Sequence, residues 1–233
     1  MPLDGALMPA LPHDTALGRL AQAILRDHPG RIALVSSFGA DSAVLLHMVA
    51  RISPATPVLF NDTGMLFAET LDHQRRLAAL LGLTNVRIVR PTAFAVARAD
   101  PQGGLHRTQA DACCALRKVG SLDRALAPFD AWITGRKRFQ SPGRRALPFA
   151  ERDEAGRVKL NPLADWTAQD LRDYARAHDL PPHPLTARGF PSIGCAPCTS
   201  PVAEGEDQRA GRWRGSAKTE CGIHLNGARL QRA

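Results

Sequence analysis

Two kinds of hydrophobic pattern alternate along the chain. Short apolar runs bounded by turn residues predict buried strands, and apolar positions that recur every three or four residues predict helices with one buried face. The strands predicted in this way are Arg31–Ser36, Pro57–Phe60, Val86–Val89 and Ala131–Thr134, with a short hairpin over Arg145–Leu160. Helices are predicted around Leu17–Ile24 and Val44–Val49 and over Ala110–Leu126. Another helix is predicted after Gly64, ending at Leu81 with Gly82 as its C-cap, and a further one runs from Thr167 as N-cap to His178.

Strands that alternate with helices predict an α/β fold with a mainly parallel, Rossmann-like sheet and right-handed crossovers. In such sheets ligands bind beyond the carboxyl ends of the strands. The polar loops Ser36–Asp41, Asn61–Gly64 and Thr134–Arg138 all follow predicted strands, so we expect them to meet at one edge. The predicted division is a helical N-terminal extension (1–30), an α/β domain (31–180) and a C-terminal segment without periodicity (181–233).

Composition narrows the class of protein. The chain has 233 residues, 44% of them hydrophobic, which is enough for one domain with a core. No apolar run reaches the ~18–20 residues of a membrane span, and the first residues lack the pattern of a secretory signal. We therefore expect a cytoplasmic protein with no membrane partner. The sequence does not decide between a monomer and a homo-oligomer.

The net charge of +8 favours an anionic partner, either RNA or a small phosphorylated or sulfated ligand. A set of solvated surface arginines would give the same charge. The loop Ser36–Ser42 joins a predicted strand to a predicted helix, and its glycine and hydroxyl groups suit an anion at a helix N-terminus. It lacks the Gly-x-x-x-x-Gly-Lys pattern of a Walker loop. An ordinary strand–helix turn would also fit this loop.

Five cysteines stand as an adjacent pair, Cys113 and Cys114, a Cys-x-x-Cys pair, Cys195 and Cys198, and the single Cys221. In a reducing compartment this is not a disulfide framework. The two pairs suit either a tetrahedral zinc ion or an iron–sulfur cluster. Adjacent positions on a helix diverge by about 100°, which favours a larger cluster over one small ion.

Several motifs together resemble one family. Cys113–Lys118 and Ser192–Thr199 look like the paired motif of cluster-bearing adenylyl-sulfate reductases, and the tail from Arg209 to His224 looks like their C-terminal motif. The loops Ser36–Ser42, Asn61–Gly64 and Thr134–Ser141 match as well. The chain is thus identified by resemblance as an assimilatory sulfonucleotide reductase, of the adenine-nucleotide alpha hydrolase superfamily, over roughly residues 31–225.

The resemblance implies reduction of adenylyl sulfate to sulfite and AMP, with thioredoxin as reductant and an S-sulfocysteine intermediate on Cys221 in the irregular tail. It implies a 4Fe–4S cluster on Cys113, Cys114, Cys195 and Cys198, and catalytic roles for Lys118 and His224. Residues expected at the substrate, by motif and by position at strand ends, are Ser36, Ser37, Gly39, Asp62, Thr63, Gly64, Gly135, Arg136, Arg138, Gln140, Arg209 and Arg212. For Asp62, capping of the next helix is an alternative role.

Two other functions were weighed. A tRNA-thiolating enzyme of the same superfamily also combines a nucleotide loop with cysteines, but such enzymes usually carry glycine where this chain has Phe38. A zinc-bearing RNA-binding module would leave the nucleotide loop and the tail around Cys221 unexplained. We therefore expect no nucleic-acid partner, and adenylyl sulfate as the preferred substrate over its 3′-phosphorylated form.

Overall fold

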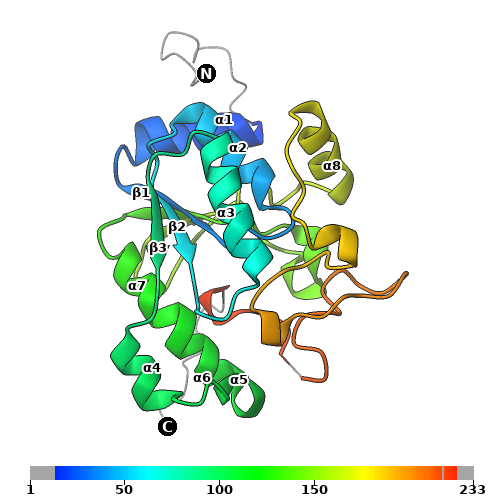
Figure 1. Cartoon of the computed structure of the whole chain (residues 1–233). Coiled ribbons are helices and arrows are strands. Elements are labelled where there is room, and N and C mark those ends of the chain that lie inside the picture. Colours follow the sequence, from blue (N-terminus) through cyan, green and yellow to red (C-terminus); the bar gives the residue numbers. More distant parts are fainter. Residues whose placement is uncertain (1–13, 217, 225–233) are drawn as a thin grey trace.

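The computed structural model describes residues 14–216 and 218–224, and their centre is a six-stranded sheet (Figure 1). The strands follow the order β3-β2-β1-β4-β6-β5, and each neighbouring pair is parallel except β5 with β6. The predicted α/β fold with a mainly parallel sheet is confirmed. The strand bounds are β1 Ile32–Ser36, β2 Val58–Asn61, β3 Val86–Val89, β4 Ala131–Ile133, β5 Ala150–Arg152 and β6 Val158–Leu160.

Side chains of the central strands alternate between two cores, because successive residues of a strand point to opposite faces. Leu34 and Phe60 belong to the larger core, whereas Ala33 and Trp132 belong to the smaller one on the other face. The larger core is closed by α1 (Ala16–Gln22), α2 (Ser42–Ile52), α3 (Ala68–Leu80) and α8 (Ala168–Ala177), and the smaller by α7 (Gly120–Leu126). Helices therefore cover both faces of the sheet.

The helix predicted over Ala110–Leu126 exists as three joined pieces. They are α6 (Ala110–Cys114), a π-helical turn (Ala115–Val119) and α7. A π-helical turn rotates the residues after it relative to an ideal helix and often occurs at functional sites. This one carries Lys118.

Two helices were not predicted, α4 (Ala93–Ala99) and α5 (Leu105–Thr108). Neither buries a residue, so the apolar periodicity that marks a helix is absent there. The capping residues predicted for α8 and α3 are confirmed. Thr167 caps α8 by accepting a hydrogen bond from Asp170 N at 3.1 Å, and Gly82 follows α3 with a φ of 64°.

The C-terminal segment is irregular, and it folds back onto the carboxyl edge of the sheet (orange to red in Figure 1). Cys195 pairs with Leu66 of the loop after β2, and Ala196 N donates to Met65 O at 2.8 Å. Among the residues described, the only regular pieces of the C-terminal segment are the short 3-10 turns Thr186–Arg188, Ala196–Cys198 and Gly222–His224. Two other 3-10 turns, Arg138–Gln140 and Pro142–Arg144, lie earlier in the chain, after β4. Within the described ranges, no helix has both the length and the apolarity to cross a membrane.

Candidate active site

A cavity of about 210 Å³ lies at the carboxyl ends of β1, β2 and β4. The loops after these strands form its base, and the C-terminal segment closes it. The predicted residues that line it are Ser36, Ser37, Gly39, Thr63, Lys118, Gly135, Arg136, Gln140, Cys195, Arg209, Arg212, Cys221 and His224. Three strand-end loops and a distant tail therefore meet in one place.

The loop after β1 is shaped by buried packing. Phe38 has a φ of 50°, and its fully buried ring contacts Phe60 edge to face at 5.3 Å between centroids. Ser36 Oγ accepts a hydrogen bond from Phe38 N at 3.1 Å. A Cβ on Gly39 would lie 3.3 Å from Ile193 O, so the missing side chain lets the C-terminal segment pack directly on this loop. The first amides of α2 then follow, where partner-free N–H groups suit an anion.

Positive charge dominates the cavity. Its lining holds six cationic side chains, Lys118, Arg136, Lys137, Arg144, Arg209 and Arg212, against two carboxylates, Asp41 and Glu220. Burial lowers the pKa of Arg136 and of Arg209 to about 10 and also lowers that of Arg212. All three guanidinium groups stay charged near neutral pH, so the cationic groups of the cavity outnumber its anionic groups even when the sulfur of Cys221 is counted as anionic. This surplus suits a ligand with several anionic oxygens.

Lys118 connects the cavity to the cysteines. Burial alone would lower its pKa, but the neighbouring cysteine sulfurs, above all that of Cys221, raise it above the ordinary value. Lys118 is therefore fully protonated near neutral pH. It stands as a point charge between the single cysteine of the tail and one member of each cysteine pair.

Cys221 lies against Cys114. The Cys114 thiol donates a hydrogen bond to the Cys221 sulfur and holds the pKa of Cys221 well below its usual range, with Lys118 and Arg212 adding to the effect against the opposing cost of burial. The same contact, with burial, raises the pKa of Cys114. Cys221 is thus the sulfur that carries negative charge, and thiolate is the nucleophilic form of cysteine.

Three buried polar atoms in the cavity lining have no hydrogen-bond partner among the residues that the structure describes. They are Arg212 Nε, His224 Nδ1 and Asn61 Oδ1. Burial and the nearby charges of Arg136, Lys159, Arg144 and Arg209 lower the pKa of His224 far below its usual range, so its imidazole is neutral. The ring stacks parallel to Trp132 at 6.5 Å between centroids. Unpaired buried polar groups cost free energy, and a bound ligand can satisfy them.

The four paired cysteines come from two distant parts of the chain. Cys113 and Cys114 are buried on α6, Cys195 is buried beside Thr63 Oγ1 at 3.2 Å, and Cys198 is half-buried in its 3-10 turn. Burial raises the pKa of Cys113, and the charges of Cys195 and Cys198 raise it further. The second cysteine pair therefore lies within electrostatic range of Cys113. Across residues 14–216 and 218–224, no three His, Cys, Asp or Glu side chains converge on a point that would hold one metal ion.

Three predicted substrate residues lie outside the cavity lining. Asp62 accepts hydrogen bonds from Arg90 at 2.8 Å and from Gly64 N at 3.0 Å. Gly64, with a φ of 71°, backs onto Arg117. Arg138 is exposed and donates to Leu147 O at 3.0 Å. These three residues support the loops around the cavity.

Further residues that line the cavity, none of them predicted individually as a substrate contact, include Asp41, Asn61, Lys137, Arg144 and Glu220. Lys137 is buried and donates to Asp41 Oδ2 at 3.0 Å. It directly follows Arg136 in the same strand-end loop, and Glu220 directly precedes Cys221. Proximity in sequence to the predicted residues was therefore an available signal for both. Arg144 had none, because its place depends on the turn Pro142–Arg144.

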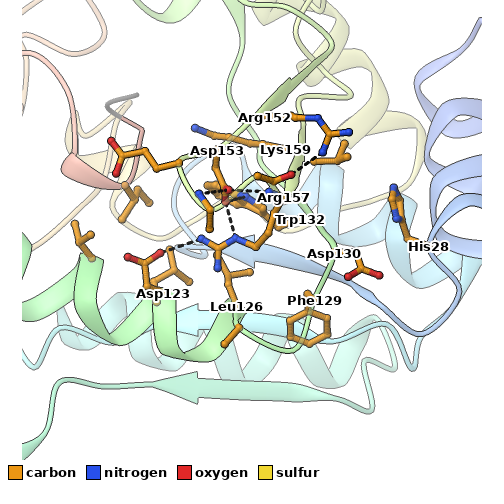
Figure 2. A pocket seen from close by; sticks show the side chains of 18 of the residues that line it. His28, Asp123, Leu126, Phe129, Asp130, Trp132, Arg152, Asp153, Arg157 and Lys159 are labelled. Atoms are coloured by element: carbon orange, nitrogen blue, oxygen red, sulfur yellow. Dashed lines mark hydrogen bonds and ion pairs between the residues drawn. The ribbon is translucent and has the colours of Figure 1, made fainter. Parts of the chain in front are cut away.

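A second, larger cavity of about 860 Å³ opens beside α7, β4 and the hairpin of β5 and β6 (Figure 2). Its central charges neutralise one another. Arg157 pairs with Asp123 at 3.0 Å and with Asp153 at 2.6 Å, and Trp132 Nε1 donates to Asp153 at 3.0 Å. The turn carrying Ile223 forms a wall of both cavities. Because its charges are satisfied and no cysteine lines it, this cavity is a weaker candidate for chemistry.

Comparison with known proteins gives a consistent result. Residues 31–201 match the phosphoadenosine phosphosulfate reductase domain. The chain is 53% identical to an adenosine 5′-phosphosulfate reductase of Mesorhizobium japonicum, over 96% of this chain and 90% of that protein. It is 45% identical to a phosphoadenosine 5′-phosphosulfate reductase of Gloeobacter violaceus, over 88% and 86% of the two chains. The crystal structure of phosphoadenylyl-sulfate reductase from Candida auris aligns with a TM-score of 0.68 and 25% identity, covering 87% of this chain and 99% of that one.

Proposed function

The chain belongs to the phosphoadenosine phosphosulfate reductase domain family, and we propose that it reduces adenylyl sulfate to sulfite and AMP with thioredoxin as the electron donor. One observation carries this proposal. The cavity brings a half-buried, negatively charged Cys221 together with Lys118 and Arg212 at the end of a nucleotide-type loop. A thiolate surrounded by cations is suited to attack a group that is itself anionic.

The first step follows from these charges. The Cys221 thiolate attacks the sulfur of adenylyl sulfate, the bond from that sulfur to the phosphate oxygen breaks, and AMP leaves with the electron pair. Repulsion between the thiolate and the sulfate oxygens opposes this approach, and Lys118, Arg209 and Arg212 offset it. The unpaired Nε of Arg212 and Nδ1 of His224 are available to bind the substrate oxygens. S-sulfocysteine remains on the enzyme.

In the second step a thiolate of reduced thioredoxin attacks the Cys221 sulfur. The sulfur–sulfur bond to the sulfonate breaks, and sulfite leaves with the electron pair. The second thioredoxin thiol then attacks the mixed disulfide and restores the Cys221 thiolate. The dithiol supplies both electrons, so the sequence of steps is balanced without any further donor. We also propose that the enzyme acts in the cytoplasm.

We also propose that Cys113, Cys114, Cys195 and Cys198 hold a 4Fe–4S cluster. The donor set fits by its chemistry, because Cys113 interacts electrostatically with Cys195 and Cys198 of the second pair. Four cysteine thiolates are the usual ligands of an iron–sulfur cluster. When bound, such a cluster supplies an electrostatic field at the side of the cavity where Lys118 lies.

The test is release of sulfite and AMP from adenylyl sulfate by the anaerobically purified protein with thioredoxin, its reductase and NADPH. We expect turnover of adenylyl sulfate and slower turnover of the 3′-phosphorylated form. No sulfite from either substrate would contradict the proposed function. Equal or faster turnover of the phosphorylated form would contradict only the substrate preference.

A further inference from the structure

Glu220, the residue directly before Cys221, is bound by two arginines. Its Oε2 accepts hydrogen bonds from Arg144 Nε at 2.7 Å and pairs with Arg144 Nη2 at 2.6 Å. Its Oε1 lies 3.5 Å from Arg209 Nη2 and accepts a hydrogen bond from the Cys221 backbone N–H at 2.8 Å. The Glu220 carboxylate therefore holds the tail against Arg144 and Arg209, and it orients the backbone of Cys221 directly.

The pair is largely shielded from water. The side chain of Arg144 is 8% exposed and that of Glu220 is 17% exposed. Burial alone would raise the pKa of Glu220, but the charges of Arg144 and Arg209 lower it by more than burial raises it. The pKa of Glu220 is therefore below its ordinary value, and the carboxylate stays ionised. Charge-assisted hydrogen bonds in such surroundings are strong, and removal of one partner leaves a poorly solvated charge behind. The contact is therefore one of the stronger links between the tail and the α/β domain.

The same contact reaches the nucleotide loop. Arg144 Nη1 also donates to Gln140 Oε1, which accepts the Lys137 backbone N–H at 3.1 Å. Gln140 Nε2 in turn lies 3.5 Å from Asp41 Oδ2, and the Lys137 ammonium group donates to the same oxygen at 3.0 Å. Polar contacts thus run from the loop after β1, through the turns after β4, to the backbone of Cys221.

We propose that Arg144 and Glu220 are positioning residues that hold Cys221 in the cavity while the nucleotide is bound. Neither is assigned a contact with the reacting atoms. Their role is to keep the tail closed, so that the thiolate stays beside Lys118 and Arg212 instead of in solvent. The kinetic part of this inference rests on the proposed function, whereas the placement of Cys221 by the ion pair does not.

The test uses the substrate-free, anaerobic holoenzyme and three variants, Glu220→Gln, Arg144→Gln and the double variant. Alkylation of Cys221 by iodoacetamide is followed by peptide mass spectrometry at pH 8.5, where a solvated thiol is about half ionised. We expect each variant to be labelled about tenfold faster than wild type, because a weakened charge-assisted bond releases the tail. We also expect kcat to fall about tenfold while KM for adenylyl sulfate changes less than about twofold.

The double variant should resemble the single ones, since both remove the same ion pair. Glu206→Gln is the matched control, because it removes an ion pair with Arg214 in the same C-terminal segment, exposed and without contact to Cys221; its labelling should equal that of wild type. If Glu220→Gln does not fold, Arg144→Gln breaks the pair from the other side, and AMP binding reports the integrity of either protein.

Wild-type labelling rates and kcat in both single variants would overturn the inference, as would additive effects in the double variant. A wild-type enzyme that does not reduce adenylyl sulfate, but whose Cys221 is labelled faster in the variants, would contradict the proposed function and leave the positioning role supported. A wild-type enzyme that reduces adenylyl sulfate, together with unchanged labelling of Cys221 in the variants, would support the proposed function and contradict the positioning role.

Discussion

At the scale of single residues, the surroundings of Cys221 decide its chemistry. An ordinary cysteine has a pKa of about 8.5 and is mostly protonated near neutral pH. With Cys114 as a free thiol, its hydrogen bond lowers the pKa of Cys221 well below that, and the charges of Lys118 and Arg212 lower it as well. If Cys114 binds the proposed cluster, it has no thiol proton to donate, and the charges of Lys118 and Arg212 remain. Because the other four cysteines are the proposed cluster ligands, Cys221 is the thiol left for covalent chemistry.

Cys221→Ser should abolish sulfite release and leave AMP binding intact. Serine is similar in size but far less acidic, and it forms no thiosulfonate that a dithiol can reduce. In the wild type, incubation with adenylyl sulfate and no reductant should add one sulfonate group to the peptide that contains Cys221, as read by mass spectrometry. Turnover by the serine variant, or an unmodified Cys221 peptide in the wild type, would show that another group is the nucleophile.

At the scale of elements, the C-terminal segment is held by backbone contacts rather than by regular structure. Ser200 N donates to Gly211 O at 2.9 Å, and Trp213 N donates to Cys198 O at 3.0 Å. These bonds fix the distance between the Cys-x-x-Cys turn and Arg212. They also require Gly211, because a Cβ there would overlap the carbonyl oxygen of Ser200.

Gly211→Ala should therefore move residues 198–200 away from residues 211–213. Overpacking of this kind costs about 1–3 kcal/mol, so we expect a lower thermal midpoint and weaker AMP binding. Gly143→Ala is the matched control, since a Cβ at that position meets no atom within 4 Å and should change neither measurement. Equal midpoints for the two variants would mean that the segment adapts without cost.

A contact between the C-terminal segment and α3 makes the stability of the protein depend on pH. His183 of the C-terminal segment is fully buried, with Nε2 3.0 Å from Thr70 Oγ1 of α3 and its ring 4.8 Å from His73. Burial, with a contribution from His73, lowers the pKa of His183 to about 4. A histidine with a lowered pKa binds fewer protons when folded than when unfolded between about pH 4 and 6.5. Its contribution to stability is complete above pH 6.5 and declines as the pH falls towards 4.

His183→Gln should flatten the dependence of unfolding free energy on pH within that window. Urea unfolding of wild type and variant at pH 5 and pH 8 measures this. We expect the stability difference between the two proteins to be smaller at pH 5 than at pH 8. At pH 5 the unfolded wild type gains a proton on His183 that the buried ring does not bind, and the variant has no such group. A difference that is the same at both pH values would exclude His183 as the titrating group.

At the scale of the whole molecule, the proposed cluster joins parts of the chain that are far apart in sequence. Protein purified without oxygen should be yellow-brown and contain iron and acid-labile sulfide in equal amounts. Serine at any one of the positions Cys113, Cys114, Cys195 or Cys198 should lose the colour, whereas Cys221→Ser should keep it. Stoichiometric zinc without sulfide, in protein produced with iron available, would exclude the cluster.

The strands, the main helices and the parallel sheet followed from the sequence, because short apolar runs and helical periodicity are local properties. The convergence of three polar loops also followed, since parallel strands end at one edge. The exposed helices α4 and α5 did not, because no buried face marks them. The π-helical turn inside the predicted helix left no apolar signal either.

Only the tertiary structure decided which side chains of a strand-end loop face the cavity. Lys137 lines it and Arg138 does not, although they are neighbours of equal charge, because the turn after β4 directs them apart. The cysteine spacing likewise showed that Cys221 belongs to neither of the two cysteine pairs. It did not show that Arg144 would form an ion pair with Glu220. Motif residues are recognised one at a time from local sequence, whereas an ion pair between distant residues exists only after the chain has folded.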